Sequence, residues 1–174
     1  MNDTLMRIAK EVAAIPWGEA RTAQEVEKLG KGTCTGKHLL LEQRLKAAGI
    51  PCRPVVCTFR WSDQGLKLPT HLEAILKEGD WLHGHNFLQV KNTDGTWIDL
   101  DVTWDPPLRE YGFMTLPDDW NGGTSFVGLK FDTRWDDVSM AEKKVELING
   151  LDSAQKERRE RFLKGFIPWI DSLR

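Results

Sequence analysis

The order of helical and extended patterns along the chain constrains the fold more than any other feature of the sequence. Apolar residues at helical spacing predict three early helices, at residues 3–14, 22–30 and 34–48. Extended apolar runs come afterwards, at residues 53–61, 85–90 and 96–100. Helices that precede a group of strands, rather than alternating with them, are typical of an α+β fold and not of a doubly wound parallel sheet.

Local signals refine this order. Thr22 followed by Glu25 forms a capping box at the start of the second helix. The Asp94-Gly95 turn joins the last two extended runs as a hairpin, which predicts an antiparallel sheet. We also expect a helix or strand at 71–77, a surface loop at 105–123 and another strand at 125–131. From Ser139 onward the pattern is helical. Asp152 or Ser153 is expected to cap the last helix, whose charged residues 157–161 are expected to be solvated.

The length and the net charge of the chain limit the number of domains and the kinds of partner that we expect. The chain has 174 residues, of which 40% are hydrophobic, so we expect one domain over residues 1–174, with a central core at about 30–105 and a C-terminal helical extension at about 138–174. The 24 basic against 26 acidic residues give a net charge of −2, which argues against a nucleic-acid partner. The sequence shows neither a long apolar run nor a signal-peptide pattern, so we expect a cytoplasmic protein without a membrane partner.

The cysteines direct attention to thiol chemistry. Three cysteines cannot form a closed disulfide framework, which fits a reducing compartment. Cys34 lies at a predicted helix start, where the positive end of the helix stabilises a thiolate, whereas Cys52 and Cys57 fit core positions. His85 begins an extended run and Asp101 follows the next one, so a hairpin would bring imidazole and carboxylate together. These residues predict a thiol nucleophile with a base and an orienting acid.

Neighbouring residues compete for two of these roles. Asp99 and Asp101 point to the same side of a strand, so alternation does not separate them. His83 lies two residues before His85, and the strand that follows directly favours His85. His38, one turn after the start of its helix, would form a metal site together with His83 and His85, although no further pair of spaced ligands accompanies them.

Four segments together resemble a known family. They are Gly32–Cys34, the stretch from Ala48 through Gly49-Ile50-Pro51 to Val56, His85–Val90, and Gly95–Trp104 with Trp97, Asp101 and Thr103. This order is similar to the core of the transglutaminase-like superfamily, whose pattern has a G-x-C before a helix, a "GIP" segment, a His motif and a W-x-x-x-D-x-T motif. Phe87 stands where that pattern usually has Trp, and Val102 where Pro is common.

The resemblance implies a papain-like cysteine proteinase (transglutaminase-core) fold, in which the nucleophile helix packs on an antiparallel sheet. It makes Cys34 the nucleophile, His85 the general base and later the acid, and Asp101 the residue that orients the imidazole. Its spacing selects Asp101 over Asp99.

The implied chemistry is attack on an amide and formation of an acyl-enzyme on Cys34. Water would resolve it as in a cysteine protease or amidase, and an amine would resolve it as in transglutaminase-like acyl transfer. We expect hydrolysis of a peptide, protein or other amide, without a cofactor or metal, because the sequence has no loop like the Ca²⁺ loop of animal tissue transglutaminases. The alternatives are a binding module that retains the fold without turnover, and a zinc-binding regulatory domain.

Two further parts of such a site are expected from residue chemistry. An oxyanion needs donors besides the Cys34 backbone N–H, and the candidates are the Trp17 indole and the Gln24 amide. Eight tryptophans against one tyrosine either line a cleft or fill the core. The cleft candidates are Trp61, Trp81 and Trp104.

Overall fold

The computed structural model describes residues 3–174, and its centre is a four-stranded antiparallel sheet in the order β3-β2-β1-β4. The strands are β1 (Cys52–Phe59), β2 (His83–Lys91), β3 (Trp97–Leu100) and β4 (Arg134–Asp136). Strand β1 pairs with β2 from Cys52↔Val90 to Phe59↔His83, and β2 pairs with β3 across the predicted hairpin. Together with the helices around the sheet, this confirms the α+β class.

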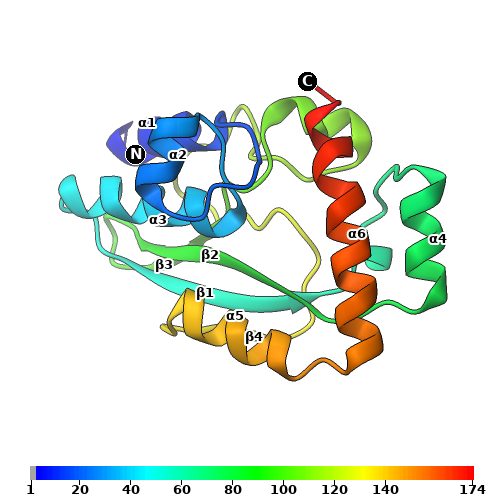
Figure 1. Ribbon diagram of the computed structural model, residues 1–174. Helices are drawn as coiled ribbons and strands as arrows, with labels where there is room; N and C mark the ends of the chain where they lie inside the picture. The colour runs from blue at the N-terminus through cyan, green and yellow to red at the C-terminus, as the bar shows by residue number, and fades with distance from the viewer. Residues whose placement is uncertain (1–2) are drawn as a thin grey trace.

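Helices lie on both sides of the sheet (Figure 1). They are α1 (Asp3–Ala13), α2 (Ala23–Leu29), α3 (Cys34–Ala47), α4 (Thr70–Glu78), α5 (Met140–Asn149) and α6 (Ser153–Asp171), with short 3-10 turns η1 (Trp61–Asp63) and η2 (Pro106–Tyr111). Figure 1 shows α6 running beside α4, and α5 shares an aliphatic core cluster with α1 to α3 through Met140 and Leu147. The segment at 71–77, which the sequence left open, is therefore helical.

The caps explain where the helices begin. The Thr22–Glu25 capping box is formed as predicted, and Gly30 ends α2 with a φ of 67°, a left-handed conformation that glycine adopts readily. Asp152 caps α6 through a second capping box with Gln155. The charged stretch at 157–161 is solvated only in part, because Arg158 and Arg159 are half-buried.

Two predictions about the segment after β3 were wrong. Residues 125–131 do not form a strand: Phe126 makes an isolated bridge with Leu100, and the Gly128 N–H then turns away to the Asp101 carboxylate. The fourth strand is β4, which pairs with β1. The stretch 105–123 is not a simple surface loop, because four of its apolar residues are at most 5% exposed: Leu108, Phe113, Leu116 and Trp120.

The core has two parts. One lies between α1 to α3 and the sheet and consists mainly of aliphatic side chains, including Leu5, Leu41 and Leu88. The other lies toward α4 and α6 and is rich in aromatic rings, among them Trp81 and Phe162. Most of the tryptophans thus belong to the core, as expected for large aromatic side chains, which bury much apolar area in small domains.

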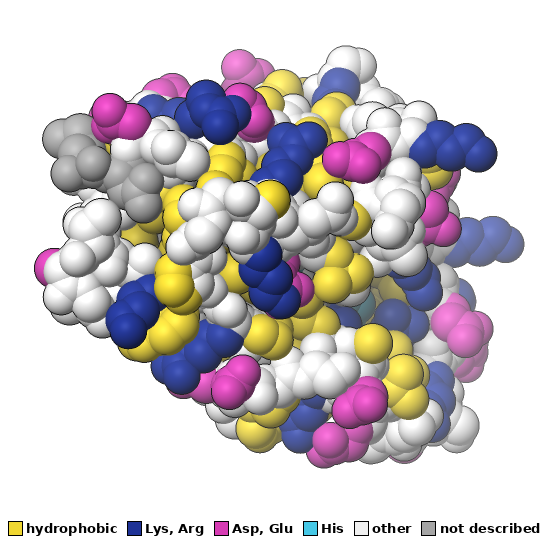
Figure 2. Space-filling view, turned by 90° about the vertical axis from the view of Figure 1, so that its left-hand side faces the viewer, with side chains coloured by type: hydrophobic (Ala, Val, Ile, Leu, Met, Phe, Trp, Pro, Cys, Tyr) yellow, Lys and Arg dark blue, Asp and Glu magenta, His cyan; other side chains and the backbone are white. Residues whose placement is uncertain are grey.

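The outer surface is charged. The face drawn in Figure 2 carries basic and acidic side chains intermixed, with apolar side chains scattered between them. Across residues 3–174, no helix combines the length and the apolar character that crossing a bilayer requires.

Candidate active site

Cys34 is the first residue of α3, and its position is fixed by the chain before it. The Thr33 hydroxyl caps the helix by accepting from the Gly36 N–H, and it donates to the Ala20 carbonyl. The backbone is so close there that a Cβ at Gly36 would lie 2.3 Å from the Ala20 oxygen, which explains the glycine. The helix therefore presents its positive end at the half-buried Cys34.

His85 and Asp101 meet on the sheet beside this helix. His85 lies on β2, Asp101 comes directly after β3, and the Nε2 of His85 is 2.8 Å from the Oδ2 of Asp101. The carboxylate also accepts the backbone N–H groups of Thr103 and Gly128. Burial alone would raise the pKa of Asp101, but the charge and hydrogen bond of His85 hold it below its usual range. Asp101 is therefore an ionised acceptor for His85.

The competing residues occupy other positions. Asp99 pairs with Arg134 at 2.8 Å and accepts from Gln89, so it is not the partner of His85. His83 accepts a hydrogen bond from the Trp81 indole, and burial holds its pKa well below the usual value. The structure thus brings Asp101, and not Asp99, to the histidine beside Cys34.

The electrostatics favour an ion pair between thiolate and imidazolium. Burial raises the pKa of Cys34, but the charge of Lys144 and the hydrogen bond and charge of His85 outweigh it and lower the pKa to about 5. Burial lowers the pKa of His85, yet Asp101 and Cys34 raise it to about 9. Between these values Cys34 carries a negative charge and His85 a positive one, so the arrangement can attack a carbonyl without prior proton transfer.

The other two thiols lack such partners. Burial raises the pKa of Cys52 to about 11, and burial raises the pKa of Cys57 as well. Thiols of this kind are largely protonated near neutral pH and react slowly. Cys34 is therefore distinct among the three cysteines.

Three further polar residues surround Cys34, and none of them was singled out from the sequence. Lys144 on α5 donates to the Cys34 Sγ at 3.1 Å and to the Thr35 hydroxyl at 2.8 Å. Thr35 donates to the side-chain oxygen of Asn86, whose amide N–H₂ donates to the Cys34 carbonyl at 3.3 Å. Asn86 directly follows His85, but neighbouring side chains on a strand point to opposite faces, so the sequence did not mark it. No local signal marks Lys144 either.

Both ring nitrogens of His38 have hydrogen-bond partners within the protein. Its Nδ1 lies 2.7 Å from the Cys34 carbonyl oxygen, and its Nε2 accepts the Val102 backbone N–H at 3.1 Å. Burial lowers the pKa of His38 to about 4, so the ring is neutral and its Nδ1–H is the donor. Through these two hydrogen bonds, His38 links α3 to the segment that follows Asp101. Among residues 3–174, no group of three His, Cys, Asp or Glu side chains is arranged to hold a metal ion.

The structure does not bring the predicted oxyanion donors into contact with this site. The Trp17 ring packs against Trp104 and Phe166, with ring centroids 5.9 and 5.4 Å away. Gln24 is exposed on α2. Within residues 3–174, neither side chain donates a hydrogen bond to the Cys34–His85–Asp101 group. The residue types of Trp17 and Gln24 allow hydrogen-bond donation, but they do not indicate where the side chains lie in the fold.

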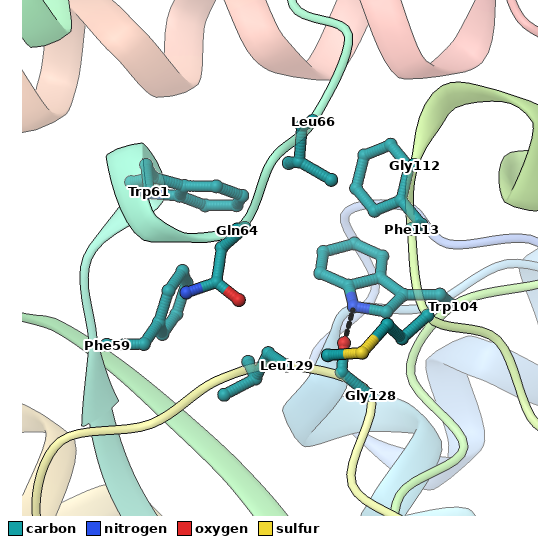
Figure 3. A pocket seen from close by; sticks show the side chains of 10 residues that line it. Phe59, Trp61, Gln64, Leu66, Trp104, Gly112, Phe113, Gly128 and Leu129 are labelled. Carbon is teal, nitrogen blue, oxygen red and sulfur yellow. Dashed lines mark hydrogen bonds between the residues drawn. The ribbon is translucent and has the colours of Figure 1, made fainter.

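Two of the three cleft tryptophans line a pocket (Figure 3). Its empty volume is about 260 Å³, and Trp61 and Trp104 form part of its wall. It borders the site, because the Gly128 N–H binds Asp101 while the Gly128 carbonyl accepts from the Trp104 indole. Trp81 is wrongly predicted here: it is 0% exposed and packs against Phe162. The other lining residues are Phe59, Gln64, Leu66, Gly112, Phe113, Met114, Gly128 and Leu129.

Part of the chain resembles a known protein family. A model of the transglutaminase-like superfamily matches residues 7–102, from α1 to just beyond β3. The matched stretch contains Cys34, His85 and Asp101 but ends well before α5 and α6. No curated protein matches the chain.

Proposed function

The chain belongs to the transglutaminase-like superfamily, and on that premise we propose that it is a thiol enzyme that cleaves an amide bond through an acyl-enzyme on Cys34. A domain of this superfamily suggests cysteine-based catalysis in general. The observation that carries the specific proposal is the contact series from the Cys34 thiol through His85 to the buried Asp101, with a His85–Asp101 distance of 2.8 Å. We take the fold to be papain-like, with α3 as the nucleophile helix.

The first half of the reaction transfers the acyl group to sulfur. The Cys34 thiolate forms a bond to the amide carbon, and the carbonyl electron pair moves to the oxygen, which becomes an oxyanion. The imidazolium of His85 then gives its proton to the amide nitrogen, which leaves as an amine while the carbonyl re-forms. Asp101 stays ionised and keeps the ring oriented.

The second half releases the acyl group. Neutral His85 takes a proton from water, the resulting hydroxide attacks the thioester carbon, and Cys34 leaves as a thiolate. An amine in place of water would give acyl transfer. We favour water, because water needs no dedicated site, whereas efficient transfer requires an amine to be bound and water to be excluded.

The pocket beside His85 suits one apolar side chain of the substrate. Its lining is mostly aromatic and aliphatic, which suits an apolar group of the substrate. The Phe59 ring, which lines it, lies 6.0 Å from the His85 ring, so a side chain held there would lie next to the reacting groups. We therefore assign Trp61 and Trp104 to substrate binding and favour amides that carry an apolar group near the bond that breaks.

The test is to trap the acyl-enzyme. p-Nitrophenyl acetate is mixed with the protein, and mass spectrometry of the quenched sample locates any acetyl group. The proposal predicts acetylation of Cys34 with a burst of p-nitrophenol, and loss of both in Cys34→Ala. Cys52→Ala is the matched control, because it removes a half-buried thiol outside the site. An unmodified Cys34 would contradict the proposal and favour the binding-module alternative.

A further inference from the structure

Lys144 reaches Cys34 from α5, which packs on the same face of the sheet as α3. Met140 and Leu147 of α5 join the aliphatic cluster that also holds Leu40 and Leu41 of α3. The Lys144 side chain passes Gly84, whose added Cβ would lie 3.5 Å from the Lys144 Cγ and 3.4 Å from the Leu147 Cδ1. Gly84 and His85 point to opposite faces of β2, so one strand accommodates the lysine stem and positions the imidazole.

The ammonium group is fixed but retains a free donor. It donates to the Cys34 Sγ at 3.1 Å and to the Thr35 hydroxyl at 2.8 Å. The Thr35 hydroxyl donates its hydrogen to the Asn86 Oδ1, so the Thr35 oxygen acts as the acceptor for Lys144. An ammonium has three N–H donors. For the third N–H of Lys144, the structure shows no acceptor anywhere in residues 3–174.

We propose that Lys144 is the second oxyanion donor, acting together with the backbone N–H of Cys34. This inference rests on the proposed function, since it concerns the same acyl transfer. Cys34 is the first residue of α3, and the N–H groups of a first helical turn have no acceptor within the helix. Lys144 thus supplies the donor that neither Trp17 nor Gln24 provides.

The chemistry of the step explains why the cation belongs there. Before attack the negative charge is on the Cys34 sulfur, and the ammonium donates to it. As the S–C bond forms, sulfur becomes neutral and the charge moves to the carbonyl oxygen, which is attached to the carbon that Sγ attacks. A donor already in contact with Sγ needs only a small rotation to follow that charge. Donors aimed at a developing oxyanion typically contribute a factor of about 10² to 10³ to the rate.

The surroundings of Lys144 define the pH behaviour of the test. The titratable groups whose pKa the charge of Lys144 lowers are Cys34 on α3, His83 on β2 and Cys57 on β1, and His85 is affected through its contact with Cys34. Removal of the ammonium also removes a charge that favours the Cys34 thiolate. The test must therefore separate thiolate formation from oxyanion stabilisation.

Two probes make this separation on the same thiol. Iodoacetamide alkylates Cys34 without forming an oxyanion, whereas p-nitrophenyl acetate acylates it through one. Each variant is assayed at a pH where its own alkylation rate has reached its plateau, so that Cys34 is fully ionised in all of them. The variants are Lys144→Met, Lys144→Gln and Lys144→Arg, with Lys143→Met as the matched control. Lys143 precedes Lys144 on α5, but its ammonium lies over the Trp135 ring and pairs with Glu146.

The proposal predicts that Lys144→Met alkylates within about twofold of the unmodified protein but acylates about 10² to 10³ times more slowly. Lys144→Gln keeps an N–H donor without the charge, so its acylation rate should lie between those of Lys144→Met and the unmodified protein. Lys144→Arg should keep most of the acylation rate, and Lys143→Met all of it. Equal alkylation and equal acylation, or a parallel loss of both, would overturn the proposal and leave Lys144 as at most a partner of the thiolate. If the unmodified protein does not acylate at all, the proposed function itself has failed.

Discussion

The Nε2 of His85 lies 2.8 Å from the Oδ2 of Asp101, and both residues are at most 2% exposed. In a buried environment an imidazolium and a carboxylate interact strongly, because little water screens them. The carboxylate therefore both orients the ring and keeps it charged while Cys34 is a thiolate. Removal of the Asp101 charge should therefore weaken both the Asp101–His85 contact and the His85–Cys34 ion pair.

Asp101→Asn is expected to slow acylation of Cys34 by about 10² to 10⁴-fold. The neutral amide no longer raises the pKa of His85, so the imidazolium is lost at a lower pH and the pKa of Cys34 rises. Asp99→Asn is the matched control, since Asp99 binds Arg134 and Gln89 instead of His85. Acylation rates with p-nitrophenyl acetate at pH 7 check this. A larger effect at Asp99 than at Asp101 would contradict the assignment.

Acid is expected to destabilise the protein below about pH 6.5. The pKa of Cys34 is lowered from 9.0 to about 5, and that of His85 is raised from 6.5 to about 9. Between pH 6.5 and 9 the folded pair holds one proton on His85 and the unfolded pair holds one on Cys34, so the pair adds no pH dependence. Below pH 6.5 the unfolded histidine gains a second proton. The free energy of unfolding then falls by about 1.4 kcal/mol per pH unit until the folded thiolate protonates near pH 5.

Urea unfolding at several pH values measures this slope. His38 adds to it in the same direction, because its folded pKa of about 4 lies below its ordinary value. Cys34→Ala should retain the His38 contribution and lose that of the pair. A free energy of unfolding that is constant or rises as pH falls from 6.5 to 5 would show that the ion pair is not formed.

Lys37 is expected to stabilise the fold, not to take part in chemistry. It is 0% exposed, and its ammonium donates to the carbonyls of Ala13, Ile15 and Thr103. Burial lowers its pKa to about 7, against the pull of Asp105 and Asp101. Lys37→Met leaves three carbonyl oxygens without this donor and should lower the free energy of unfolding by about 3 kcal/mol.

Lys46→Met provides the comparison for Lys37→Met. Lys46 lies on the same helix, but its side chain is 63% exposed and pairs with Glu42 one turn away. Exposed pairs of this kind contribute little, so the change should stay within about 0.5 kcal/mol. Urea unfolding of the two variants at one pH gives both values. Equal losses would mean that the buried hydrogen bonds contribute no more than a surface pair.

The sequence predicted the parts of the site that lie close to a recognisable pattern. Cys34 could be placed at a helix start because a glycine-rich break and a long helical pattern surround it. The choice between Asp99 and Asp101 was open from alternation, since both point to one side of the strand, and only the family spacing selected Asp101. In the structure Asp101 is the carboxylate that lies beside His85. Lys144 could not be found, because it is 110 positions from Cys34 and only the packing of α5 on the sheet brings it there.

The fold shows the same division between long and short patterns. Long periodic segments such as α1 and α3 were predicted almost to the residue. Strand β4 has three residues, too few for an alternating pattern to show, and its pairing with β1 depends on distant residues. The apolar residues of 105–123 occur singly among glycine, proline and aspartate, so their burial against α1 and α6 could not be predicted from periodicity.

The central claim is that His85 activates Cys34, and its most direct test is the rate of iodoacetamide alkylation of Cys34 against pH. Mass spectrometry locates the label in the unmodified protein and in His85→Ala. The account predicts that Cys34 reacts with a midpoint near pH 5, that Cys52 and Cys57 stay unlabelled there, and that His85→Ala moves the midpoint upward. Labelling of Cys34 with the profile of an ordinary thiol, or labelling only after unfolding, would contradict it.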